Sequence, residues 1–158
     1  MNIPSEQECM ELLEELNPRI MKHSVYVKDL ALEIADSMER KGAKVNRDLL
    51  IAGALLHDIT KSHVGDRHNL TGEALLVKLG YPEVGRIVRK HFLGTNPETP
   101  EQKIIYYVDK IVNPGRVKVS IEERMKYVFD KYDIPEEKFS IFYNEIKNIE
   151  NELLGESS

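Results

Sequence analysis

The sequence predicts an all-α protein. Apolar side chains recur at helical spacing nearly throughout, and no stretch alternates apolar and polar residues for long enough to form a sheet. Prolines stand where expected helices begin, at Pro82, Pro100 and Pro135, because proline suits the first helical turn. The 158 residues, of which 41% are hydrophobic and 31% charged, have the size and composition of one compact domain. We therefore expect a single helical domain over residues 1–158.

The expected helices follow in order from their end signals. Ser5 and Glu8 form a capping-box pattern, which predicts the start of a first helix that ends before Pro18. The second helix stops at Gly42, because glycine suits the left-handed conformation that closes a helix. Asn46 is expected to cap a third helix, which is apolar on most of its circumference and so belongs in the middle of the bundle. The expected spans are residues 5–16, 18–42, 47–59, 70–79, 82–92, 101–112, 120–132 and 136–154.

Composition and charge argue against several classes of protein. The formal net charge of −5 argues against a protein that mainly coats nucleic acid. The longest apolar run, Leu49–Leu56, is 8 residues long, whereas a membrane span needs about 20. The first residues lack the basic start and apolar stretch of a signal peptide, and the lone Cys9 cannot form an internal disulfide. We expect a cytoplasmic protein. Its segment 61–116, with 9 basic and 6 acidic side chains, is where an anionic small molecule would be attracted.

Four expected helices each place an ionisable side chain on an apolar face. His23, His57, His91 and Asp109 lie three, four or seven residues from apolar neighbours, and Asp58 stands directly beside His57. Burying such groups costs on the order of several kcal/mol unless they are paired or bound to a metal. Any one of them alone is more simply explained by a hydrogen bond or an ion pair. Together they favour a metal site, because histidine nitrogen and carboxylate oxygen suit divalent ions such as Fe, Mn and Zn.

The arrangement of these residues resembles the HD superfamily of metal-dependent phosphohydrolases. The pattern consists of His23, His57, Asp58 and Asp109. The resemblance covers residues 19–116, and the string Leu56–Lys61 is similar to the HDIG-type signature, with Thr60 where glycine is usual. It implies an HD-domain helical bundle, with residues 117–158 as additional C-terminal helices.

The resemblance also implies a set of metal ligands. In such proteins the four-residue pattern binds one metal ion, and two further histidines hold a second. The first ion would be bound by His23, His57, Asp58 and Asp109, and the second by His68 and His91, with Asp58 bridging. His63 is not assigned to either ion, because the spacing of His68 to Gly72 at a helix start is more similar to the family pattern. The one or two divalent ions would be Fe, Mn, Co, Zn or Mg.

Hydrolysis of a phosphate ester or anhydride is the reaction that the resemblance implies. Two cations a few Å apart lower the pKa of a shared water and hold the oxygens of a phosphoryl group. Lys61, three residues after Asp58, is expected to reach the phosphate, and Arg116 or Arg124 to add guanidinium contacts. The alternative for these three is a surface lysine and two arginines at helix ends.

The substrate and the reaction leave alternatives open. Residues 91–116 resemble bacterial HD-type enzymes that split dinucleoside polyphosphates, which favours a nucleotide, but Phe92 and Leu93 stand where that pattern has a polar pair. One rival function is a mixed-valent di-iron oxygenase on the same scaffold, which uses six His and Asp ligands. Another is a non-catalytic sensor of a nucleotide. The last expected helix carries an apolar stripe from Phe139 to Leu153, which either closes the domain or forms a homodimer.

Overall fold

The computed structural model consists of α-helices joined by turns and loops, and it describes residues 1–61, 67–112 and 118–155. Within these ranges no strand forms, and an isolated bridge pairs Val112 with Lys118. The expected all-α class is therefore confirmed. No described helix has the length and apolar character needed to cross a membrane. The helices are α1 (Glu6–Leu13), α2 (Pro18–Arg40), α3 (Arg47–Leu56), α5 (His68–Lys78), α6 (Pro82–Arg89), α7 (Pro100–Lys110), α8 (Ile121–Tyr132) and α9 (Glu136–Leu154).

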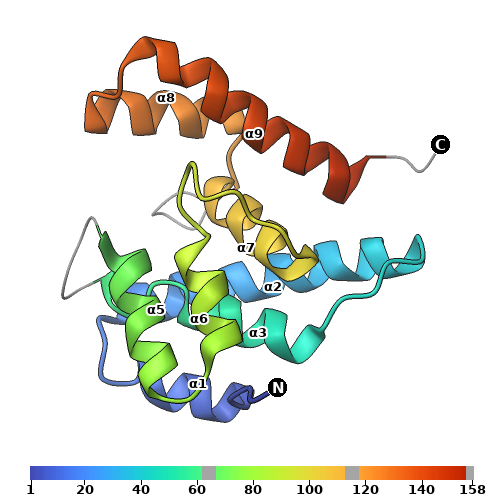
Figure 1. Cartoon of the computed structure of the whole chain (residues 1–158), viewed down its shortest axis with the longest axis vertical. Coiled ribbons are helices and arrows are strands. Elements are labelled where there is room, and N and C mark those ends of the chain that lie inside the picture. The colour runs from blue at the N-terminus through green and yellow to red at the C-terminus, as the bar shows by residue number, and fades with distance from the viewer. Residues whose placement is uncertain (62–66, 113–117, 156–158) are drawn as a thin grey trace.

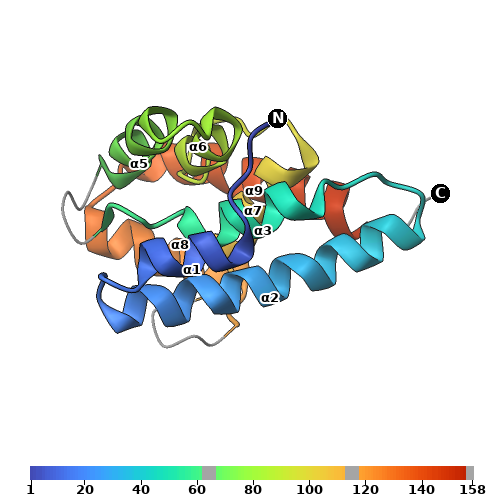
Figure 2. The ribbon, with the colours of Figure 1, turned by 90° about the horizontal axis from the view of Figure 1, so that it is seen from below.

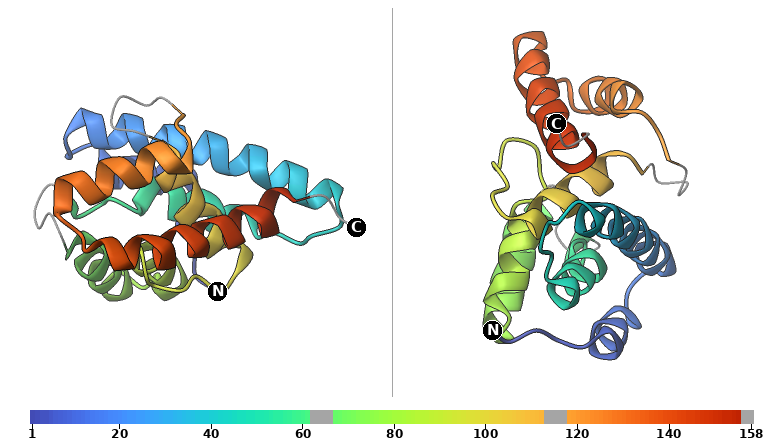
Figure 3. Two further views of the ribbon diagram at one scale, coloured as in Figure 1. Left: turned by 90° about the horizontal axis from the view of Figure 1, so that it is seen from above. Right: turned by 90° about the vertical axis from the view of Figure 1, so that its right-hand side faces the viewer.

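Two helices, α3 and α7, form the middle of the molecule. The α1 and α2 helices lie on one side of them and α5 and α6 on the other (Figure 1 and Figure 2). The α8 and α9 helices run side by side at one end, and α9 crosses α7 (Figure 3). Seven of the ten residues of α3 are buried, and this helix packs against α1, α2, α6 and α7. Its apolar circumference thus correctly predicted a central position.

The expected capping residues act as predicted. The Glu8 N–H donates to Ser5 Oγ at 3.1 Å, and the Ser5 N–H donates to a Glu8 carboxylate oxygen at 3.2 Å, which completes a capping box. The Asn46 side chain accepts a hydrogen bond from the Leu49 N–H at 3.1 Å and begins α3. These bonds satisfy N–H groups that the first turn of a helix leaves without a partner.

Several helices end earlier than the sequence predicts, and two of these ends lie beside candidate site residues. The α3 helix stops at Leu56 instead of residue 59, and the Ile59 N–H then donates to the carbonyl of Leu56, three residues back. The α6 helix stops at Arg89 instead of residue 92. His57 and His91 therefore lie in turns just after helix ends, and His57 keeps helical backbone angles (φ −61°, ψ −30°).

Two buried glycines let α6 pack closely against its neighbours. A Cβ atom on Gly53 of α3 would lie 2.8 Å from Cγ2 of Ile87, and one on Gly72 of α5 would lie 2.7 Å from Cγ1 of Val88. Both distances are shorter than contacts between packed side chains. Glycine at these positions brings α3 and α5 close to α6, and three candidate histidines lie at the ends of these helices.

The apolar stripe of α9 is used within the chain. Ile146, Ile149 and Leu153 are buried, and the rings of Phe139 and Phe142 pack against Phe129 of α8. This packing is expected if the stripe of α9 closes the domain. A homodimer stays a prediction.

Candidate metal centre

Six histidine and aspartate side chains from separate parts of the chain converge on one site. They form two groups, and within each group the ligand atoms lie within 4.8 Å of one another. The first group is His23, His57, Asp58 and Asp109, and the second is Asp58, His68 and His91. These are the six residues that the sequence resemblance implies as ligands.

Helix ends place most of these side chains. His57 and Asp58 follow α3, His91 follows α6, and Asp109 lies in the last turn of α7. The carboxyl end of a helix carries a partial negative charge, which favours a cation nearby. Three such ends meet at this site, and a further histidine of the cluster, His68, begins α5.

The Asp58 carboxylate joins the two groups. Its Oδ2 lies 3.6 Å from Nε2 of His23 and 3.3 Å from Nε2 of His57. Its Oδ1 lies 2.9 Å from Nε2 of His68 and 3.5 Å from Nε2 of His91. Each oxygen thus faces one pair of histidines, an arrangement suited to a carboxylate that bridges two cations.

The chemistry of the donor atoms fits a cation. Nδ1 of His57 donates to the Ala54 carbonyl at 2.7 Å, so Nε2 is the acceptor atom of the neutral ring. This Nε2 faces Nε2 of His23 at 3.3 Å and Oδ1 of Asp109 at 3.4 Å. Acceptor atoms at such separations need a proton or a cation between them. A cation about 2.1 Å from each ligand atom, at angles of about 90–109°, would hold those atoms about 3.0–3.4 Å apart.

The second group is largely buried, with His68 as its most exposed member. His91 is 1% exposed, its Nδ1 donates to the Val88 carbonyl, and its Nε2 lies 3.2 Å from Nε2 of His68. The Phe92 ring packs edge-on against both imidazoles, with centroid separations of 4.7 and 4.8 Å. Thr60 Oγ1 donates to the His68 carbonyl at 2.9 Å. Threonine at the position where the signature has glycine therefore holds the start of α5.

Buried carboxylates set the proton affinities of the site. Burial lowers the pKa of His57, but the charge of Asp58 and a hydrogen bond to Asp109 outweigh it and raise that pKa from 6.5 to about 10. Burial also raises the pKa of Asp58 and Asp109, yet their histidine neighbours hold both well below 3.8. Both carboxylates are thus ionised at neutral pH, so the site attracts cations.

The residues predicted to bind phosphate lie in different surroundings. Lys61 is exposed at the edge of the cluster, where its Nζ lies 3.9 Å from Oδ2 of Asp58. Arg124 is half-buried on α8 and donates to a backbone carbonyl of the segment after α7 at 3.4 Å. Of these two, Lys61 is the one that contacts a candidate ligand. The remaining candidates, Arg116 and His63, lie outside the described residues.

Sequence reasoning missed one residue of the site, Lys110. This side chain is buried, and its Nζ lies 3.7 Å from Oδ2 of Asp109 and donates to the His91 carbonyl. Burial lowers its pKa to about 8. The sequence could have indicated Lys110 as a buried residue of the site, because it follows Asp109 directly within the largely apolar stretch 104–112.

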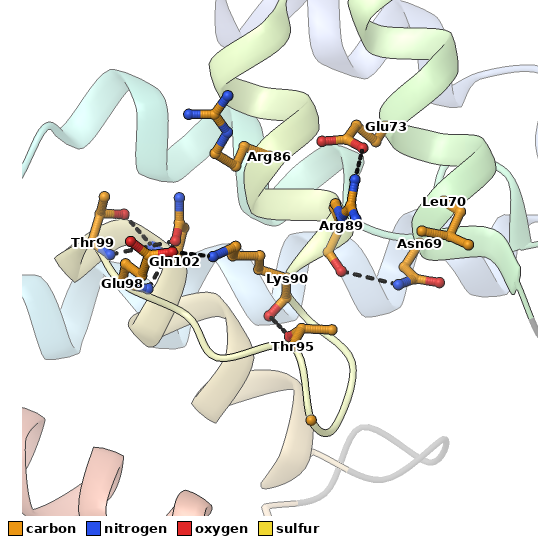
Figure 4. Close-up of a pocket in the computed structure, with 11 residues that line it drawn as sticks. Asn69, Leu70, Glu73, Arg86, Arg89, Lys90, Thr95, Glu98, Thr99 and Gln102 are labelled. Carbon is orange, nitrogen blue, oxygen red and sulfur yellow. Dashed lines mark hydrogen bonds and ion pairs between the residues drawn. The ribbon is translucent and has the colours of Figure 1, made fainter.

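A polar cavity of about 680 Å³ lies between α5, α6 and the start of α7 (Figure 4). None of the six candidate ligands lines it. Most of its charges are paired with one another, since Arg89 contacts Glu73 at 3.2 Å and Lys90 contacts Glu98 at 2.5 Å. The cavity and the ligand cluster are therefore separate features.

Comparison with known proteins points to one family. The family model described as HD domain matches residues 20–113. An uncharacterized protein of Methanocaldococcus jannaschii is 26% identical over 139 residues, which are 76% of this chain and 82% of that protein. The dihydroneopterin 2′,3′-cyclic phosphate phosphodiesterase of the same organism is 35% identical over 111 residues, 58% of this chain and 45% of that enzyme. A tRNA (cytidine(56)-2′-O)-methyltransferase of Picrophilus torridus is 30% identical over 151 residues, 83% of this chain and 41% of that enzyme. The chain thus spans less than half the length of these two enzymes. No solved structure gives a significant match.

Proposed function

We propose that this chain, which belongs to the HD-domain family, is a metal-dependent phosphohydrolase that cleaves a phosphate ester or anhydride of a nucleotide or dinucleoside polyphosphate. The observation that carries the proposal is the position of Asp58. Its two oxygens each face a separate pair of histidines, at 2.9–3.6 Å. This spacing suits two cations that share one carboxylate, the arrangement that phosphoryl chemistry uses.

The side chains of the cluster are oriented for this chemistry. Two divalent cations, when bound, supply a water of lowered pKa and polarise the phosphoryl oxygens. Nδ1 of His57 and Nδ1 of His91 donate to backbone carbonyls, so both Nε2 atoms are directed into the site. The imidazole rings therefore need little rearrangement to act as ligands.

One side of the cluster is open to a substrate. The side chains of His23 and Asp109 are each 15% exposed, whereas His57 and His91 are sealed. Lys61 is exposed beside this open side, where its ammonium would neutralise a phosphate oxygen. The substrate phosphate therefore approaches from the side of Lys61.

The phosphodiesterase and the methyltransferase among the relatives suggest different reactions. The phosphodiesterase acts on a 2′,3′-cyclic phosphate, as its name states, which supports cleavage of a phosphate ester and adds cyclic phosphodiesters to the substrates worth testing. The methyltransferase match spans less than half of that enzyme. Two carboxylates and four histidines gathered in one site support metal-assisted hydrolysis, because the transfer of a methyl group does not need two cations to activate a water.

The test measures metal content and hydrolysis on the same preparation. Protein stripped with a chelator is reconstituted with Mn²⁺, Co²⁺, Fe²⁺ or Mg²⁺, and bound metal is counted by mass spectrometry. Hydrolysis is then followed by chromatography on nucleotides, 2′,3′-cyclic nucleotides and dinucleoside polyphosphates. We expect about two ions per chain and metal-dependent turnover. Two bound irons with oxygen uptake and no hydrolysis would instead favour the oxygenase, and nucleotide binding without turnover would favour the sensor.

A further inference from the structure

We infer that Lys110 is a positioning residue that holds the second group of ligands in place relative to the first. The inference rests on the proposed metal centre. It concerns the last residue of α7, whose side chain is buried and carries no ligand atom of either group. The question is what a buried ammonium does directly beside a site that attracts cations.

The contacts of Lys110 reach both groups at once. Its Nζ lies 3.7 Å from Oδ2 of Asp109, which belongs to the first group. The same Nζ donates to the carbonyl of His91, which belongs to the second group. It also donates to the Tyr106 carbonyl at 3.4 Å and lies 4.2 Å from the centre of the Tyr106 ring. One side chain thus ties the end of α7 to the turn that carries His91.

A second link joins the same two segments from the side of α9. The Glu145 carboxylate accepts a hydrogen bond from the Tyr106 hydroxyl at 2.5 Å and another from the Gly94 N–H at 3.3 Å. Tyr106 lies on α7, and Gly94 follows His91 by three residues. The turn after α6 is therefore held to α7 at two points, and Lys110 makes the link nearer to the ligands.

Charge and positioning predict opposite effects of removing Lys110. As a positive charge, it repels divalent ions, so its removal would tighten the binding of both. As a positioning residue, it fixes the distance between His91 and Asp58, and its removal frees the turn to move. Metal sites tolerate ligand displacements of about 0.2 Å, so the second ion would then bind more weakly.

The experiment compares two lysines of the same helix. Lys110→Met keeps the length of the side chain but removes the donor. Lys103→Met is the matched control, because Lys103 also lies on α7 but pairs with Glu152 on α9 at 2.5 Å, and it contacts no candidate ligand. Co²⁺ binding to chelator-stripped protein is titrated by calorimetry. We expect Lys110→Met to lower the affinity for the second ion about 10–100-fold and the affinity for the first ion less than about threefold. Lys103→Met should bind both ions with the affinities of the wild type.

A readout without metal completes the test. Long-range ¹H–¹⁵N spectra of the metal-free protein should show altered His91 ring signals in Lys110→Met and unchanged ones in Lys103→Met. Tighter or unchanged binding of both ions in Lys110→Met would overturn the inference. If that variant does not fold, Lys110→Gln replaces it; its donor is one atom closer to the backbone and should fall short of the His91 carbonyl, so we expect the same weaker binding of the second ion. If both fail to fold while Lys103→Met folds, Lys110 serves folding and the inference is wrong. Wild-type protein that binds no Co²⁺ would overturn the metal centre itself, and this inference with it.

Discussion

Replacing Gly72 with alanine tests whether the contact between α5 and α6 sets the spacing of the second pair of histidines. The new Cβ would lie 2.7 Å from Cγ1 of Val88, whereas ordinary contacts begin at 3.4 Å, so the two atoms must separate by about 0.7 Å. Val88 is fully buried, and close packing in a protein interior leaves little room for its side chain to turn. The strain is therefore relieved by movement of one helix against the other.

This movement should affect metal binding more than stability. Alanine gains about 1 kcal/mol over glycine in helix propensity, and overpacking costs about 1–3 kcal/mol, so the free energy of unfolding should fall by about 0–2 kcal/mol. His68 begins α5 and His91 follows α6, so the displacement changes their separation directly. A shift of about 0.7 Å exceeds the tolerance of about 0.2 Å for a metal ligand. We expect the affinity for the second ion to fall at least about tenfold.

The assay combines a Co²⁺ titration with urea unfolding of the metal-free protein. The matched variant is the double substitution Gly72→Ala with Val88→Ala, because it removes the Cγ1 atom that the new Cβ would strike. We expect the double variant to regain the affinity for the second ion, although the smaller side chain at position 88 loses packing contacts and some stability. An unchanged second affinity in Gly72→Ala, or no recovery in the double variant, would refute the reasoning.

Three further predictions concern the cluster and the core. Asp58→Ala should lose bound metal and hydrolysis but keep its helical circular dichroism, because the apolar faces of the helices do not depend on this carboxylate; normal metal content would contradict the site. Against the effect of burial, Asp58 and Asp109 raise the pKa of His57 to about 10 in the metal-free protein. The stability from this shift is present below pH 6.5 and is lost as the pH rises through about 10, so urea unfolding should show a decline over this range that His57→Gln lacks. Burial raises the pKa of Cys9 to about 12, so iodoacetamide should label it only after unfolding; rapid labelling of native protein would show that Cys9 is accessible.

The fold class, three of the histidines and Asp109 could be predicted because they leave a periodic signal, whereas Asp58 was noted as the neighbour of His57 and His68 followed only from the family resemblance. Apolar spacing of three and four residues identified the helices, and ionisable residues on those same faces stood out against it. His91 is an example in which the direction of the side chain was predicted correctly but the end of the helix was not. It was expected within a helix and lies in the turn after α6, yet it points inward as predicted. The spacing gives the direction of a side chain more reliably than the last residue of a helix.

Contacts between distant segments carry no such signal. Whether Lys110 reaches the His91 carbonyl, or Thr60 the His68 carbonyl, depends on how the helices pack, and neither pair has a characteristic spacing. The close approach at Gly72 is likewise a property of two helices together. The roles of the six residues as ligands, the phosphate contacts of Lys61, Arg116 and Arg124, and a single domain over residues 1–158 stay predictions.

The order of the candidate ligands along the chain has a consequence for the lifetime of the protein. They come from five stretches between residues 23 and 109, whereas α8 and α9 contribute none of them. Bound ions would therefore cross-link most of the chain from α2 to α7, and at a free concentration one hundred times the dissociation constant an ion adds about 2.7 kcal/mol against unfolding. Proteases that cut the unfolded chain would then act fastest on the metal-free form. In a metal-poor cell, the amount of this protein, as well as its activity, would follow the metal supply.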